Sequence, residues 1–211
     1  MRVFFVWLLF PMLGFGQAKL PLVFKTSPLG FVNPFQQTVE LLTDIPIATH
    51  WGLELGAVWV TNSLVFAQFK GEMYRGLKLK PAIKYYFERA DGVGSYLAFA
   101  LKYHQIHNDR YNQEWRQGGQ YTEWALRRRS VVAWGASVKF GTQQYLDNKK
   151  RWIIEPFMGF GVRRKVITQE ASPPDAEQFD TRAFFSILKQ PGTYLGGDLL
   201  VGIYFGYVFT R

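Results

Sequence analysis

The sequence contains no cysteine, which excludes both a disulfide framework and a thiolate metal site. Beyond residue 18 it also lacks any run of about eighteen apolar residues, which excludes transmembrane helices. Aromatic side chains, in contrast, are abundant: Phe, Trp and Tyr make up 18% of the chain, within an ordinary hydrophobic total of 48%. This combination is typical of a membrane β-barrel, whose apolar residues alternate with polar ones and form no long runs.

Residues 1–18 have the features of a secretory signal. Arg2 supplies a positive start, Val3–Phe15 is a mainly apolar stretch, and Gly16–Ala18 offers small residues for cleavage. The apolar stretch is too short to span a membrane comfortably as a helix. We therefore predict an exported chain, with a cleaved signal at 1–18 and one domain at 19–211.

Positive charge is in excess, with 25 Lys and Arg against 16 Asp and Glu and a formal net charge of +9. Such a balance usually indicates a nucleic-acid partner. Here the cations are spread through the chain and its start predicts export, so we expect no nucleic-acid partner. The predicted partners are instead outer-membrane lipid and lipopolysaccharide. Basic loops of the protein would lie near the anionic headgroups of these lipids.

The last segment of the chain alternates with a period of two. One face carries only apolar and aromatic side chains: Leu199, Val201, Ile203, Phe205, Tyr207 and Phe209. Successive side chains of a strand point to opposite sides, so this face is a continuous apolar wall. The pattern predicts the closing strand of an outer-membrane barrel, with Phe209 as a candidate recognition signal for the barrel-assembly machinery.

Seven further segments predict strands, which brings the total to eight: Leu20–Lys25, Phe35–Leu42, Trp51–Trp59, Leu77–Phe87, Leu97–Tyr103, Val132–Phe140 and Trp152–Val162. A soluble β-sandwich would share the alternation but would turn its charges to water. In these rows the partners of the large residues are mostly small or charged, as in the lumen of a narrow barrel. Tryptophans near row ends match interfacial girdles. The predicted fold is an all-β, eight-stranded antiparallel transmembrane β-barrel.

The predicted connections alternate in length. Three are brief and rich in turn-forming residues: Thr43–Thr49, Arg89–Gly94 and Leu146–Lys150. Three are longer and more polar: Asn62–Arg75, Asn108–Arg129 and Thr168–Thr193. Short periplasmic turns and longer outer loops are the asymmetry of bacterial barrels. Asn108–Arg129 interleaves aromatic and arginine side chains, which either bind a ligand or extend the flanking strands as a hairpin, and we favour the extension.

Several motifs resemble the DUF3575 family of small outer-membrane barrels, which is common in Bacteroidetes. They are Lys25–Leu29 (KTSPL), Glu40 within a strand-like stretch, Trp51–Gly56 (WGLELG) and Gly76–Phe87, a glycine followed by a strand that ends in aromatics. The resemblance implies an eight-stranded outer-membrane barrel and no reaction. The Asn108–Arg129 segment is not a feature of that family.

Charged residues occupy positions that the predicted alternation turns inward: Glu40, Glu54, Lys78, Lys80, Lys84, Lys102, Lys139, Glu155 and Arg163. The interior of an eight-stranded barrel is just wide enough to be filled by side chains. Charges removed from water must be paired or stay hydrated. We therefore expect a lumen plugged by ion pairs. The alternative is a small anion passage, because six of the nine charges are cations.

Two histidines raise the question of catalysis. Barrel enzymes that modify lipid A use a serine close to a histidine, but no serine lies within two positions of His104 or His107. A general base without a nucleophile has nothing to activate. Their three-residue spacing also puts the two rings on opposite faces of a strand, which disfavours a shared metal.

We accordingly predict no catalytic residue, no metal and no cofactor. The predicted function is that of a non-enzymatic outer-membrane protein of envelope structure or surface interaction. A lipid A-modifying enzyme, with His104 or His107 as its base, is the alternative from a different class.

Overall fold

The computed structural model describes residues 21–31, 37–61, 73–88, 93–171, 177–178 and 191–209. The predicted signal lies outside these residues, as do parts of the predicted loops on either side of β4 and β9. The described residues form one short helix, α1 (Pro28–Phe31), and the following strands: β1 (Leu22–Thr26), β2 (Gln37–Pro46), β3 (Trp51–Thr61), β4 (Met73–Tyr86), β5 (Ser95–Arg116), β6 (Tyr121–Thr142), β7 (Gln144–Tyr145), β8 (Trp152–Gln169), β9 (Glu177–Gln178) and β10 (Gly192–Phe209). No helix in this part of the chain is long and apolar enough to cross a membrane.

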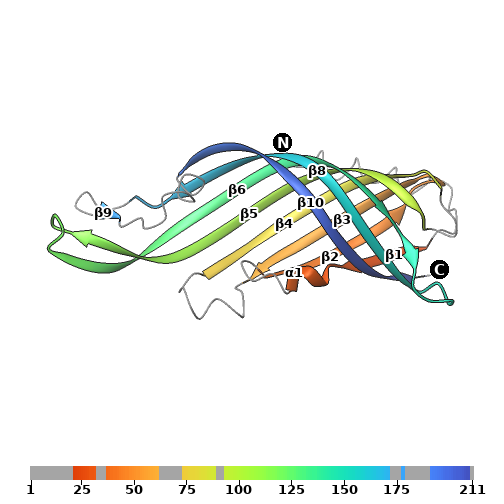
Figure 1. Cartoon of the computed structure of the whole chain (residues 1–211), viewed down its shortest axis with the longest axis horizontal. Helices are drawn as coiled ribbons and strands as arrows, with labels where there is room; N and C mark the ends of the chain where they lie inside the picture. The colour runs from red at the N-terminus through yellow and green to blue at the C-terminus, as the bar shows by residue number, and fades with distance from the viewer. Residues whose placement is uncertain are drawn as a thin grey trace, which may run out of the picture.

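Eight of the strands form a closed ring (Figure 1). Each of β1 to β6 pairs with its neighbour in sequence, β6 pairs with β8, and β8 pairs with β10. The ring closes because β10 also pairs with β1, from Leu22 opposite Phe209 to Thr26 opposite Phe205. Every pairing is antiparallel. The eight-stranded antiparallel β-barrel predicted from the sequence is therefore confirmed.

Two predicted connections are partly or wholly strand in the structure. β2 continues to Pro46, so Thr43 and Asp44 belong to the sheet rather than to a turn. β5 and β6 each have 22 residues and stay paired as far as Arg116 opposite Tyr121. The Asn108–Arg129 segment is thus the hairpin extension that we favoured, and Figure 1 shows it projecting beyond the other strands. We call this end of the barrel the hairpin end.

The opposite end, which we call the turn end, has short connections. Asp147 closes the turn before β8, because its carboxylate accepts hydrogen bonds from the backbone N–H groups of Trp152 and Arg151, both at 2.8 Å. These bonds favour the charged form and lower the pKa of the Asp147 carboxyl. The C-terminal end of β10 lies at the same end, beside β1 (Figure 1).

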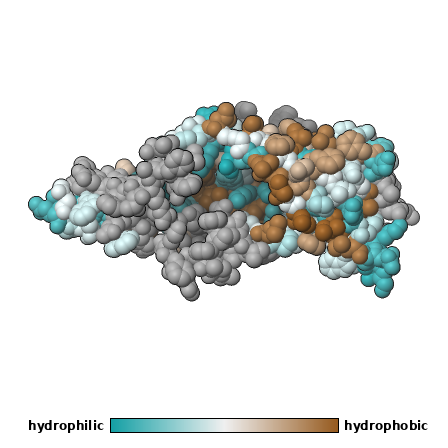
Figure 2. Space-filling view, in the orientation of Figure 1, coloured by the Kyte–Doolittle hydropathy of each residue, from teal (hydrophilic) through white to brown (hydrophobic). Residues whose placement is uncertain are grey.

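Large apolar side chains cover the outside of the barrel. Leu199 and Val201 of β10 are 71% exposed, whereas Tyr204 and Val208 face the interior with 4% exposed. Every ring strand contributes exposed apolar residues: Phe24, Leu41, Leu55, Ile83, Phe99, Val138, Phe160 and Leu199. Figure 2 shows hydrophobic residues gathered over the flank of the barrel and hydrophilic residues at both ends of the molecule. The distribution is the reverse of that in a soluble protein.

Candidate functional site

Charged side chains from five strands meet inside the barrel, toward the turn end. The ammonium groups of Lys25 on β1 and Lys84 on β4 both lie between the same three carboxylates, those of Asp44, Glu54 and Glu155. Lys25 Nζ lies 2.9, 2.7 and 2.8 Å from these carboxylates in that order, and Lys84 Nζ lies 3.0, 2.8 and 2.8 Å from them. All five side chains are buried.

Polar neighbours add further hydrogen bonds to this group, and only Asp44 Oδ1 among the carboxylate oxygens of these described residues is buried without a hydrogen-bond partner. Lys139 Nζ donates to Glu54 at 2.6 Å. The amide of Gln143 donates to Asp44 at 2.6 Å and to Glu155 at 2.7 Å. The Tyr96 hydroxyl donates to Glu155 at 2.5 Å. We call the six charged residues the ion cluster: Lys25, Asp44, Glu54, Lys84, Lys139 and Glu155. Its three cations balance its three anions, so the cluster is neutral.

The three carboxylates of the ion cluster bring oxygen atoms within 4.8 Å of one another, a spacing that would suit a metal ion. Two ammonium nitrogens, however, already lie within 3.0 Å of all three groups. The protein's own lysines thus supply the positive charge that a metal ion would bring. A buried charge is tolerated when it is paired and hydrogen-bonded, and this arrangement meets both conditions.

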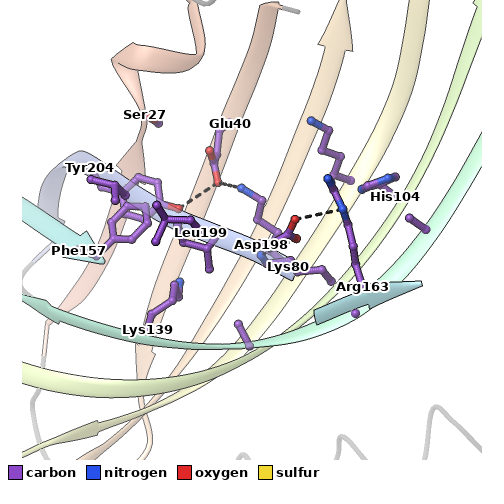
Figure 3. A pocket seen from close by; sticks show the side chains of 18 of the residues that line it. Ser27, Glu40, Lys80, His104, Lys139, Phe157, Arg163, Asp198, Leu199 and Tyr204 are labelled. Atoms are coloured by element: carbon purple, nitrogen blue, oxygen red, sulfur yellow. Dashed lines mark hydrogen bonds and ion pairs between the residues drawn. The ribbon is translucent and has the colours of Figure 1, made fainter. Parts of the chain in front are cut away.

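A cavity of about 360 Å³ adjoins the ion cluster on the side of the hairpin end (Figure 3). We call it the vestibule. Glu40 accepts hydrogen bonds there from Lys80 at 2.7 Å and from the Tyr204 hydroxyl at 3.3 Å. Asp198 lies 3.0 Å from Arg163 and 3.6 Å from Lys102. Outside the ion cluster, the vestibule is lined by four cations and two carboxylates: Lys78, Lys80, Lys102 and Arg163, and Glu40 and Asp198. Its lining is therefore positively charged.

The charged residues named from the sequence divide between these two levels. Glu54, Lys84, Lys139 and Glu155 belong to the ion cluster, and Lys139 also borders the vestibule. Five others line the vestibule: Glu40, Lys78, Lys80, Lys102 and Arg163. Phe209 lies apart on the outer surface, with its ring 5.2 Å from that of Phe24. Its role in barrel assembly stays a prediction.

Sequence reasoning missed three charged residues of the ion cluster and the vestibule: Lys25, Asp44 and Asp198. Lys25 lies at the end of the short predicted strand Leu20–Lys25, for which the sequence analysis predicts no inward and outward face. It directly follows the apolar Phe24, so the alternation places it on the opposite face. Asp44 falls within Thr43–Thr49, which the sequence predicts to be a brief, turn-rich connection. Asp198 follows two glycines and precedes the predicted last strand, so it was not placed on a face. In all three cases the alternation, extended by a few residues, would have turned the charge inward.

The two histidines lie on opposite sides of the barrel wall, as their spacing predicted. His104 lines the vestibule, whereas His107 borders a shallow outer cavity of about 300 Å³. The register adds a residue that sequence spacing did not reveal: Ser130 on β6 lies directly opposite His107 and borders the same cavity. The His107 ring has its Nε2 atom 3.3 Å from the side-chain nitrogen of Gln105.

No protein-family model matches the sequence, and no curated protein matches it. Among solved structures, the chain is similar to a major outer membrane protein from Thermus thermophilus. The two share 11% sequence identity, and the match covers 90% of this chain and 98% of the other, with a TM-score of 0.42.

Proposed function

We propose that this protein is a non-enzymatic outer-membrane β-barrel, exported by the signal at 1–18, that serves envelope structure or surface interaction. The observation that carries the proposal is the apolar outer surface around a closed ring with charges inside. Monomeric soluble proteins rarely expose contiguous apolar patches larger than a few hundred Å². A bilayer, in contrast, stabilises such a surface. The resemblance to the DUF3575 family is part of the same hypothesis.

The height of the apolar surface supports a bilayer as its environment. Trp51 and Trp59 bracket the apolar row of β3. Their separation along the strand is about 26 Å at ~3.3 Å per residue. A strand tilt of about 40° reduces this to about 20 Å, close to the ~25 Å apolar band of outer-membrane barrels. Further aromatic residues lie at the same two levels: Tyr85, Trp152 and Tyr207 toward the turn end, and Tyr103 and Trp134 toward the hairpin end.

The β5–β6 hairpin is the part best suited to surface interaction, with the turn end facing the periplasm. Arg127 and Glu114 form a bidentate ion pair within it. Arg127 Nε donates to Glu114 Oε1 at 2.6 Å, and Arg127 Nη2 donates to Glu114 Oε2 at 2.5 Å. The hydrogen bonds to Glu114 raise the pKa of Arg127. This pair stiffens a hairpin that carries the exposed aromatic rings of Tyr121 and Trp124. Rigid aromatic side chains are frequent anchors in protein interfaces.

We expect the wild-type protein to fractionate with outer membranes and to migrate differently on gels before and after boiling. A soluble periplasmic product would contradict the proposal. We also expect no conductance steps in planar bilayers, because the neutral ion cluster fills the lumen. The alternative of a small anion passage is favoured by the positive vestibule. Anion-selective steps that change in Lys80→Ala and Lys84→Ala variants would establish that alternative and overturn the closed lumen.

A second candidate, a lipid A-modifying enzyme, is favoured by Ser130 lying opposite His107. Directly opposed residues in a sheet have Cβ atoms about 4.5–5.5 Å apart, which brings a serine hydroxyl within reach of an imidazole. His107 would then accept the proton as Ser130 attacked an ester carbonyl, and would return it to the sugar hydroxyl that leaves as the ester C–O bond breaks. Water would then hydrolyse the acylated serine and release the fatty acid. Under our main proposal, lipid A from cells with the wild type and with Ser130→Ala has identical mass spectra. Loss of an acyl chain with the wild type and with His104→Ala, but not with Ser130→Ala, would establish the enzyme.

A further inference from the structure

A groove crosses the outer surface of the barrel near the hairpin end. It has a volume of about 780 Å³ and an almost wholly apolar lining. We call it the outer groove. Its apolar border includes Leu79, Leu101, Trp134, Ala136, Val162 and Leu195, and three cationic residues also line it: Lys102, Arg163 and Arg164. These residues come from five successive strands of the ring, β4, β5, β6, β8 and β10.

The register explains why the surface is hollowed here. Cross-strand neighbours form rows around the barrel, and one outward row contains the small residues Ala136 and Gly197, with Val162 between them. The row on the turn side consists of larger side chains: Phe99, Val138, Phe160 and Leu199. The row on the hairpin side also consists of larger side chains: Tyr103, Trp134, Arg164 and Leu195. The middle row also contains Leu101, opposite Ala136, so it is Ala136 and Gly197 that leave a groove between the two rows of large side chains.

Arg164 gives the outer groove a charged border. Its guanidinium lies 5.8 Å from the centre of the Trp134 ring, in the geometry of a cation–π contact. A charge on the lipid face is costly near the bilayer centre and tolerated at the interface, which places Arg164 at headgroup level. Two rows further toward the hairpin end, Arg75 and His107 border the shallow outer cavity. Arg128, Arg129, Asp109 and Glu170 border the same cavity, and Arg75 lies 3.6 Å from Asp109. The same flank of the barrel therefore passes from apolar to charged, with three arginines against two carboxylates.

We propose that the outer groove binds an acyl chain of a phosphorylated glycolipid of the outer leaflet, and that Arg164 binds its phosphate. This inference rests on the proposed outer-membrane function. An apolar groove suits a hydrocarbon chain, and a guanidinium forms paired, charge-assisted hydrogen bonds with phosphate. The order of the two features along the barrel matches that of such a lipid, with the chain toward the bilayer centre and the phosphate at the surface.

The test measures binding of purified lipid A to the detergent-solubilised barrel by native mass spectrometry. Arg164→Gln is expected to weaken binding about tenfold or more, because it removes the charge-assisted hydrogen bonds to the phosphate. Ala136→Phe is expected to weaken binding to a similar degree, because its ring fills the groove that the acyl chain would occupy. Two matched controls are expected to bind as the wild type does. Val138→Phe adds the same ring one row away on the same face of β6, and Arg151→Gln removes an exposed cation at the turn end.

Lipid A without phosphate groups is expected to bind the wild type and Arg164→Gln equally weakly. Equal binding of intact lipid A by all variants would overturn the site. Equal binding of phosphatidylglycerol and lipid A by the wild type would overturn the choice of a glycolipid. These results are read only on protein that shows heat-modifiable migration, so a failure of lipid binding in a folded, membrane-inserted barrel contradicts this inference alone. A chain that does not insert contradicts the proposed function.

Discussion

Replacing Lys84 by methionine is expected to lower the free energy of unfolding of the barrel by about 3–5 kcal/mol, the usual cost of removing one partner from a buried ion group. Lys84 Nζ contacts three buried carboxylates within 3.0 Å. Its loss leaves two cations of the ion cluster, Lys25 and Lys139, facing three anions. The uncompensated negative charge then lies in an interior from which bulk water is largely excluded, where it is poorly stabilised.

The measurement is the urea dependence of unfolding from lipid vesicles, followed by the fluorescence of the six tryptophans that follow the predicted signal. The double variant Lys84→Met/Glu155→Gln removes one charge of each sign and restores neutrality. We expect it to lose less stability than the sum of its two single variants, which is the signature of direct coupling. Lys149→Met, at an exposed position of the turn end, is the control and should leave the midpoint unchanged. Similar midpoints for Lys84→Met and Lys149→Met would contradict the buried cluster.

Introducing arginine at Phe160 is expected to lower stability in lipid vesicles by about 2–4 kcal/mol, the cost of this residue near the middle of the lipid face. Phe160 is 72% exposed, so it makes few contacts within the protein. In a soluble protein, a charge at such a position would be nearly neutral or favourable. The sign and size of the effect therefore report whether this face meets hydrocarbon or water.

Thr168→Arg provides the matched control for Phe160→Arg. It introduces the same side chain on the same strand, β8, and on the same outward face, but beyond the apolar surface. We expect a change close to zero there, because the cost of arginine falls to about 0–1 kcal/mol near the interface. Refolding into vesicles followed by urea titration measures both variants. Equal effects at the two positions would contradict the membrane-embedded surface.

Much of the fold could be read from local patterns. The alternation from Leu199 to Phe209 predicts a strand with one apolar face, and in the structure that face is the exposed one. The same holds for the rows that begin at Trp51 and Trp152. Strand ends were less predictable. Turn-forming residues near Asp44 suggested a connection, but pairing with β3 continues through Asp44 opposite Glu54, because hydrogen bonds across the sheet outweigh a local turn preference.

Sequence by itself determined the class of this protein, because a period of two with large residues on one face and small or charged residues on the other is a local property of each segment. It also determined which charges the alternation would turn inward. Only the closed tertiary structure decided which of those charges meet, because that depends on the register and stagger of strands far apart in the chain. Lys25 and Glu155 are 130 positions apart, yet their side chains lie 2.8 Å from each other. The register of the β5–β6 hairpin likewise decided that Ser130 lies opposite His107, and the register of β6, β8 and β10 brought Ala136 and Gly197 into one outward row at the outer groove.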